Sequence, residues 1–308
     1  MLLIEEELKR LVPERDTILA VGVFDGVHLG HQQIIARLRE RAAAGGFLAG
    51  VVTFRQHPET VFTGRKVALL TTLAEKVRLL RSIGVELVAT LSFTPALAGL
   101  PALEFVNLLQ KYMRMRGLII GEDFALGRGR EGDIDMLRHL SQGMGFSLEV
   151  VPPKMIDGEV VSSSSIRQAL VAGNISKVNK FLGRPFSLRG QVILGREVGR
   201  TLGFPTANLS LDAEQALPAD GVYATWAYPD QSRHPSVTNI GIRPTFGGGD
   251  RTVEVFILDF HGNLYGGELK IEVVQRIRDE VRFDTPEDLK AQVAKDIEKA
   301  RRLLKKAE

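Results

Sequence analysis

The chain has 308 residues, of which 44% are hydrophobic and 25% are charged. This length is typical of about two domains, and the composition excludes a disordered chain and an integral membrane protein. The absence of cysteine excludes disulfides, thiolate catalysis and cysteine-ligated metals. The N-terminal segment is acidic where a secretory signal would be basic, and no apolar run approaches about 18 residues. We therefore expect a cytoplasmic, globular protein.

The net charge of +3 is concentrated in residues 290–308, which carry seven basic and three acidic side chains. Apolar residues recur there at a spacing of three or four, namely Leu289, Val293, Ile297, Ala300 and Leu304. This spacing predicts a helix with one apolar face and a solvated basic back. A tail that binds nucleic acid is the weaker alternative, and we expect neither a nucleic-acid nor a membrane partner.

Residues 17–183 alternate short β-rich runs with amphipathic helical patterns. The predicted strands are Ile18–Val23, Val51–Phe54, Val85–Leu91 and Leu118–Gly121, and the predicted helices are His31–Ala44, Leu73–Ser82 and Leu103–Tyr112. This alternation predicts a parallel sheet covered by helices. Ligands bind such sheets at the carboxyl ends of the strands, so the chemistry is expected there.

After Gly183 the pattern changes to short strands punctuated by glycine and proline, which predicts a compact barrel. The strands are expected at Ser187–Leu194, Gly221–Tyr228, Ser236–Ile240, Val253–Phe260 and Leu269–Val274. A final helix is expected to begin near Thr285 and Pro286, because a capping residue precedes a proline and acidic residues there. We expect one α/β domain over residues 1–184 and a barrel domain with a terminal helix over residues 185–308.

The stretch from Gly22 to His31 leaves the first predicted strand, turns through glycines and enters a helix. Helix N-terminal amides favour anions, and Gly30 lets the backbone approach a ligand closely. His28 and His31 could both face a phosphate chain and donate hydrogen bonds to charge that develops during transfer. A zinc site is the rival interpretation, although no third ligand lies close by in the sequence.

Ser162 to Arg167 form a second element, which opens another predicted helix. Hydroxyls, free amides and a guanidinium at a helix start would hold phosphates. Taken alone, the same residues are equally consistent with an ordinary capped helix.

Together these two elements resemble the His-x-Gly-His and Ser-Ser-Thr-x-x-Arg signatures of the nucleotidylyltransferase superfamily. The longer run from Phe24 to His31 resembles the FMN adenylyltransferase module of bacterial FAD synthetases, as do residues 53–58, 121–124 and 182–185. The resemblance implies a Rossmann-like domain in which His28 and His31 bind ATP phosphates and aid transfer. It also implies a nucleotide site of Phe24, Asp25, Gly26, Gly30, Asp123, Ser163, Ser164 and Arg167, and a flavin site of Phe54, His57, Pro58 and Phe62.

Three positions depart from that family. Ser164 replaces threonine and keeps the hydroxyl, whereas Ser165 replaces a frequent arginine and removes one charge. Leu126 stands where relatives usually have phenylalanine, so any ring stacking there would be lost. We expect these changes to affect rate and flavin affinity rather than to abolish activity.

In the second half, Gly199–Asn208 follows a predicted strand. Thr206 and Asn208 lie two residues apart and present oxygen ligands on one side of an extended segment, which suits magnesium shared with nucleotide phosphates. On these residues alone, a proline-anchored turn whose side chains bond their own backbone would be favoured.

The order of several short runs resembles the riboflavin kinase family: 205–208, 221–224, 239–246, Glu254, 264–266 and 276–283. This resemblance implies a six-stranded barrel in which Gly203, Thr206 and Asn208 help to hold Mg-ATP. Glu254 would act as the base toward the ribityl 5′-hydroxyl, since the attacking hydroxyl loses its proton in phosphoryl transfer. Arg278 and Phe283 would lie near the flavin.

The resemblances together imply a bifunctional enzyme that phosphorylates riboflavin to FMN, releasing ADP, and adenylylates FMN to FAD, releasing pyrophosphate. Both reactions would use ATP and Mg²⁺. Two alternatives remain at this point: only one module is active, or the chain is a flavin-binding regulator or RNA-binding protein on the same fold.

Overall fold

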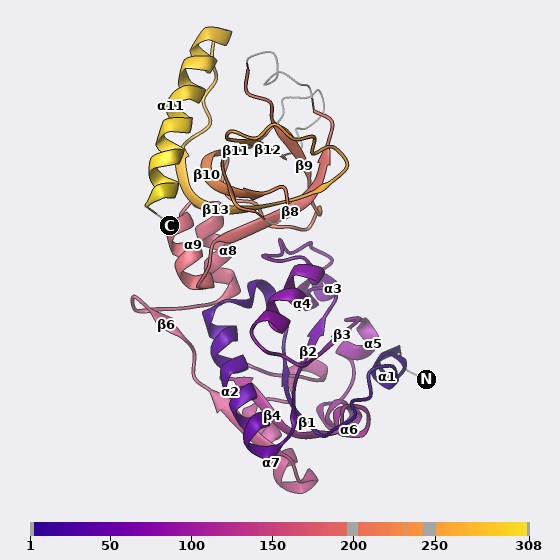
Figure 1. Cartoon of the computed structure of the whole chain (residues 1–308). Helices are drawn as coiled ribbons and strands as arrows, with labels where there is room; N and C mark the ends of the chain where they lie inside the picture. The colour runs from indigo at the N-terminus through magenta and orange to yellow at the C-terminus, as the bar shows by residue number, and fades with distance from the viewer. Residues whose placement is uncertain (1–2, 196–202, 231, 243–250, 307–308) are drawn as a thin grey trace. The chain divides into compact units, whose positions relative to one another are not determined.

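The computed structural model describes residues 3–195, 203–230, 232–242 and 251–306 (Figure 1). Packing of the backbone divides the chain into two compact units, Met1–Ser163 and Ser164–Glu308. Within the described ranges, no helix combines the length and the apolar character needed to cross a membrane.

The first unit contains a five-stranded sheet in the order β3-β2-β1-β4-β5, and every neighbouring pair is parallel. Its strands are β1 (Thr17–Val21), β2 (Leu48–Phe54), β3 (Leu87–Leu91), β4 (Met115–Gly121) and β5 (Ser147–Val151). The predicted parallel sheet is thereby confirmed. The chain runs outward from β1 to β3 and then returns to β4 on the other side of β1, which opens a crevice at the carboxyl ends of β1 and β4.

Alternate side chains of β1 serve the two faces of this sheet. Ile18 and Ala20 pack with α2 (Leu29–Gly45) and α4 (Leu73–Ser82), whereas Leu19 and Val21 pack with helices on the opposite face. Figure 1 shows α2 on one side of the strands and α1 and α6 on the other. The opposite face is covered by α1 (Leu3–Lys9), α6 (Ala102–Met113) and α7 (Ile134–Met144).

Shorter elements complete the first unit. They are a 3₁₀ turn at Asp25–Val27, α3 (Pro58–Thr63), α5 (Pro95–Ala98), a 3₁₀ turn at Arg128–Arg130, and a hairpin of β6 (Met155–Ile156) and β7 (Glu159–Val160).

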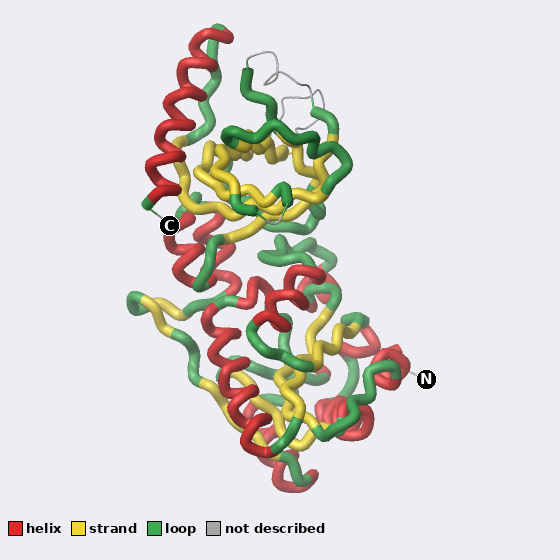
Figure 2. The backbone as a smooth tube through the Cα atoms, in the orientation of Figure 1, coloured by secondary structure: helices red, strands yellow, loops and turns green. Residues whose placement is uncertain are grey.

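The second unit is built on a closed antiparallel barrel in the order β10-β11-β12-β9-β8-β13, whose strands form a yellow ring in Figure 2. The strands are β8 (Phe186–Ile193), β9 (Ala207–Ser210), β10 (Gly221–Tyr228), β11 (His234–Ile242), β12 (Arg251–Ile257) and β13 (Glu268–Arg278). The expected six-stranded barrel is confirmed.

Two helices precede this barrel, α8 (Ser163–Val171) and α9 (Ile175–Leu182). Asn179 of α9 donates its side-chain amide to the Val273 carbonyl at 2.9 Å and accepts from the Phe186 amide at 2.8 Å. These bonds join α9 to β13 and to the start of β8.

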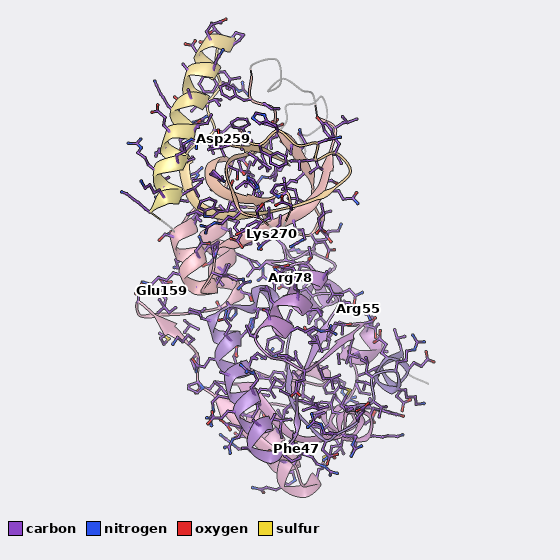
Figure 3. The ribbon with its side chains drawn as sticks, in the orientation of Figure 1. Phe47, Arg55, Arg78, Glu159, Asp259 and Lys270 are labelled. Atoms are coloured by element: carbon purple, nitrogen blue, oxygen red, sulfur yellow. The ribbon has the colours of Figure 1, made fainter. Side chains whose placement is uncertain are left out.

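The terminal helix α11 (Pro286–Lys305) begins where the sequence predicts, with the Thr285 hydroxyl accepting from the Asp288 amide at 3.2 Å. Ala300 and Leu304 are buried against Trp226 of β10, and the basic residues on the other side of the helix are exposed. Arg301 donates to Asp259, which is labelled in Figure 3, at 2.7 Å. The predicted amphipathic helix is confirmed.

Candidate active sites

The histidine loop, residues 22–31, leaves the carboxyl end of β1 with an unusual backbone. Phe24 has φ 52°, Gly26 has φ 80° and Val27 has φ 41°. A left-handed conformation is uncommon for non-glycine residues and costly for a β-branched one, so the surroundings must hold it. Within this loop His28 caps α2 by accepting from the His31 amide at 3.4 Å.

The Asp25 carboxylate provides much of that support. It accepts from the Leu70 amide at 2.9 Å and the Thr71 amide at 3.2 Å, and the Thr71 hydroxyl accepts from the Gly26 amide at 3.1 Å. On the other side, the Ser163 hydroxyl donates to the Asp25 carbonyl at 2.9 Å. Asp25, predicted to bind nucleotide, is thus 3% exposed and bonds the segment before α4. Sequence reasoning missed Leu70 and Thr71, which belong to no motif.

The two histidines lie together. Their ring centroids are 3.6 Å apart with the planes at 21°, and Phe24 packs edge-on against His31 at 5.1 Å. A Cβ on Gly30 would stand 3.1 Å from the His28 ring and 3.3 Å from the Val161 carbonyl, so a side chain there would press on the His28 ring. Two imidazoles at the positive end of α2 form an arrangement suited to a phosphate chain.

Aromatic side chains gather near the carboxyl end of β2. Phe54 ends that strand, and its ring meets Phe93 at 5.1 Å, while Phe62 of α3 meets Phe93 at 5.7 Å and is 67% exposed. His57 caps α3 by accepting from the Glu59 amide at 3.3 Å, and Pro58 opens the helix. The expected flavin residues are therefore close in the fold, and Phe93 joins two of them although sequence reasoning did not single it out.

Asp123 follows β4 and lines a pocket of about 370 Å³ together with Glu122, Phe124 and Asp133. Arg130 closes over this segment by donating to the Asp123 carbonyl at 2.8 Å. Leu126, which stands in place of the phenylalanine expected from the family resemblance, is 8% exposed and belongs to the hydrophobic core.

The serine-arginine element opens α8. Ser163 is its first residue, and Ser164 and Arg167 follow in the first turns, where Ser164 is exposed and Arg167 half-buried. The hydroxyl of Ser163 is already bonded to the Asp25 carbonyl.

In the barrel, strand register creates a row of polar side chains. Glu254 of β12 lies directly opposite Asn208 of β9 on one side and Asn239 of β11 on the other. Val253 and Val255 point into the barrel and are 1% and 0% exposed, so the row lies on the outer face. Opposed residues in antiparallel strands have Cβ atoms about 5 Å apart. The sequence does not single out Asn239, because its place beside Glu254 depends on the register of β11 and β12.

Thr206 immediately precedes β9, in a segment anchored to the same outer face. The Phe204 ring packs edge-on against Phe256 at 5.6 Å, and Phe256 lies two residues beyond Glu254. Gly203 has φ 89°, which glycine adopts readily. Gly195 approaches the Asn208 amide so closely that a Cβ there would collide with it.

Arg278 and Phe283 lie together after β13, with the guanidinium 5.8 Å from the ring centroid. That guanidinium also donates to both carboxylate oxygens of Asp296 at 2.8 to 3.0 Å, and Asp296 is 3% exposed. Arg278 therefore fastens β13 to α11, and a flavin contact of these two residues stays a prediction.

For metals, the described residues contain no group of three His, Asp or Glu side chains arranged as ligands. Thr206 and Asn208 nevertheless supply the hydroxyl and amide oxygens that Mg²⁺ accepts when phosphates and water complete its coordination. These donors fit the magnesium ion that the sequence implies.

Two family models match the chain in succession: "FAD synthetase" over residues 12–165 and "Riboflavin kinase" over residues 182–304. The fold and its two sites thus define a class of two-module flavin enzymes. A protein of Pseudomonas fluorescens named "Bifunctional riboflavin kinase/FMN adenylyltransferase" is 40% identical over 96% of both chains. The protein of that name from Escherichia coli K12 is 38% identical over 92% of this chain and 91% of its own. The chain belongs to the bifunctional riboflavin kinase/FMN adenylyltransferase family.

A solved structure supports the same two-part fold over the whole length. The crystal structure named "Macrolide-efflux Protein" from Streptococcus pneumoniae is 31% identical, has a TM-score of 0.88 and covers 96% of each chain.

Proposed function

We propose that this chain makes FAD from riboflavin in two ATP-dependent steps, first forming FMN and ADP and then FAD and pyrophosphate. The observation that carries this function is the presence of two separate constellations, the stacked histidines and the Asn208–Glu254–Asn239 row. Each lies within the range matched by its own family model. Retention of both sets argues against an enzyme with one retired module and against a binding protein.

In the kinase step, the Glu254 carboxylate takes the proton from the ribityl 5′-hydroxyl as that oxygen attacks the terminal phosphorus of ATP. A carboxylate suits this role because it can accept the proton in line with the transfer. Thr206 and Asn208 would hold Mg²⁺ with the ATP phosphates, and Gly203 would let the backbone approach them. When bound, the ion would neutralise phosphate charge. Arg278 and Phe283 would contact the flavin ring.

In the adenylylation step, an FMN phosphate oxygen attacks the α-phosphorus of ATP. His28 and His31 would donate hydrogen bonds to the phosphate oxygens as pyrophosphate leaves. The remaining nucleotide contacts would come from Phe24, Gly26, Gly30, Asp123, Ser163, Ser164 and Arg167, with Asp25 holding the loop that carries them. The flavin would lie against His57, Pro58 and Phe62, because the exposed Phe62 ring and the His57 imidazole can stack on a planar ring system. Phe54 is buried and would support this site through its ring contact with Phe93.

We further propose that the functional boundary lies at residues 184/185 and that the enzyme works in the cytoplasm on small molecules. The apolar side of α11 packs on the barrel and is therefore not available to a membrane, and we expect the exposed basic side to be solvated.

A time course with riboflavin, ATP and Mg²⁺, followed by separation of the flavins, tests both steps together. FMN should appear first and FAD second, with stoichiometric ADP and pyrophosphate. FMN without FAD, or FAD only from supplied FMN, would reduce the proposal to one active module. A salt-sensitive RNA shift without ATP turnover would replace it with a binding function.

A further inference from the structure

Lys76, in the first turn of α4, is 6% exposed. Lysine is rarely so buried unless its ammonium has partners. Here the ammonium donates to the Val23 carbonyl at 3.0 Å and to the Phe54 carbonyl at 2.8 Å. The first carbonyl belongs to the histidine loop, and the second ends the strand that leads to the expected flavin residues.

We propose that Lys76 is a positioning residue for adenylylation, whose ammonium fixes the histidine loop against the end of β2. This inference rests on the proposed FMN adenylyltransferase activity. The two segments it joins carry the two reactants in that proposal, ATP on the loop and FMN beyond Phe54. Their separation determines whether the FMN phosphate can reach the α-phosphorus of ATP.

The loop needs such an anchor because Phe24 and Val27 have left-handed backbone conformations. Thr53 of β2 also donates its hydroxyl to the Val23 carbonyl, at 2.9 Å, so Lys76 adds a second and charged link between the loop and the end of β2. Hydrogen bonds from an ammonium are roughly twice as strong as those between neutral groups. A charged lysine therefore holds two carbonyls together better than a neutral side chain would.

The charges around Lys76 determine how it titrates. Burial lowers the pKa of Lys76 to about 8, although the Asp25 carboxylate opposes that shift. On α4 itself, Glu75 is paired with Arg78, labelled in Figure 3, at 2.9 Å. Beyond β2, Arg55 lies 3.9 Å from Glu7.

Because its pKa is lowered, Lys76 should affect adenylylation and stability in opposite directions as the pH rises. Above pH of about 8 the folded protein loses the Lys76 proton, whereas the unfolded chain keeps it until about its ordinary value of 10.5. The unfolded state then binds more protons, so this residue's contribution to stability rises with pH over that window. Adenylylation should fall over the same window because the charged anchor is lost. The expected result is therefore a fall in FAD formation while circular dichroism shows the protein still folded; unfolding over the same window would leave the two causes to be separated by the variants below.

The test compares both activities in one chain carrying Lys76→Met, which keeps an apolar stem of similar length and removes the ammonium. We expect kcat for FAD formation from FMN to fall about 100-fold, the size of effect that misplaced reactants produce, with a smaller change in KM. Riboflavin phosphorylation serves as the internal control and should stay within about twofold. Lys111→Met, at an exposed position on α6, is the matched control for both rates.

A second variant keeps the inference testable if Lys76→Met folds poorly. Asp25→Asn removes the negative charge that raises the pKa of Lys76. The alkaline decline in the pH profile of FAD formation should therefore occur at lower pH than in the wild type. An unchanged FAD rate in Lys76→Met, or an alkaline limb that Asp25→Asn leaves in place, would overturn the inference. If the wild-type chain forms no FAD, the proposed function has failed instead.

Discussion

The two candidate sites are held in place by different means. In the first unit, a strained loop is held by its own Asp25 and by side chains from distant segments, among them Thr71 and Lys76. In the barrel, Asn208, Glu254 and Asn239 lie on three neighbouring strands, and backbone register places them in a row. The first site should therefore be sensitive to residues that never touch substrate, whereas the second should be sensitive mainly to its own side chains.

The largest effect on either activity is expected for Glu254→Gln. The amide cannot accept a proton, so FMN formation should fall by about 10²- to 10⁴-fold. FAD formation from supplied FMN should continue at the wild-type rate. Separate assays of the two steps measure this, with Glu268→Gln, an exposed carboxylate on β13, as the control. Loss of both activities from folded protein would show that the two sites are not independent.

His28→Ala should produce the reverse pattern. Removal of the imidazole that caps α2, and that we propose binds the ATP phosphates, should lower adenylylation by about 10²-fold or more, while riboflavin phosphorylation is retained. The control is His139→Ala, an exposed histidine on α7. A normal FAD rate in His28→Ala would remove the histidines from the chemistry.

A smaller effect is expected from Asn239→Asp, which places a second carboxylate directly opposite Glu254. Like charges at this spacing disfavour ionisation, so the acid limb of the kinase pH profile should move upward by about one unit. Glu280, whose carboxylate lies close to Gly241, is another acidic group near this row. Asn239→Ser should leave the limb in place. Identical profiles for the two variants would mean that Asn239 does not adjoin the base.

Arg278, one of the proposed flavin residues, should affect the stability of the barrel unit more strongly than it affects flavin binding. Arg278→Met leaves the buried Asp296 carboxylate without its ion pair, which should lower the free energy of unfolding of the barrel unit by about 3 to 5 kcal/mol. The single tryptophan, Trp226, packs between the barrel and α11, so its fluorescence during urea unfolding measures this. Arg278→Met combined with Asp296→Leu should recover most of the loss. A raised riboflavin KM in the folded double variant would support the flavin contact.

The sequence predicts contiguous features of the fold well. Strand and helix alternation predicts the parallel sheet, and the spacing of Ile297, Ala300 and Leu304 predicts the face on which α11 packs. The strand β9 has only four residues and follows a proline, so periodicity could not reveal it. The helix α7 and strand β5 were missed because a glycine-rich, charged stretch precedes them.

The residues of the candidate sites also differ in whether the sequence alone could predict them. His28, Gly30 and His31 form one short run in the sequence. A phosphate site could be predicted there because the strand, the turn and the helix that carry them are adjacent in the chain. Lys76 belongs to no sequence motif. Its proposed role depends on hydrogen bonds to two carbonyls on other segments, which the sequence does not reveal. Asn239 gains its place only when β11 pairs with β12 in one register. Family resemblance supplied Glu254, which on pattern alone looks like a solvent-facing strand residue.

The helix α9 has a practical consequence for separating the two activities. Its apolar residues Val178, Phe181 and Leu182 are almost fully buried, and Asn179 bonds both β8 and β13. A truncation that starts the barrel fragment at residue 185 would strip this cover and expose an apolar strip prone to aggregation. A fragment starting at Ser164 keeps α9 and all but the first residue of α8 with the strands they protect. Expression trials of the isolated kinase should therefore start at the earlier residue.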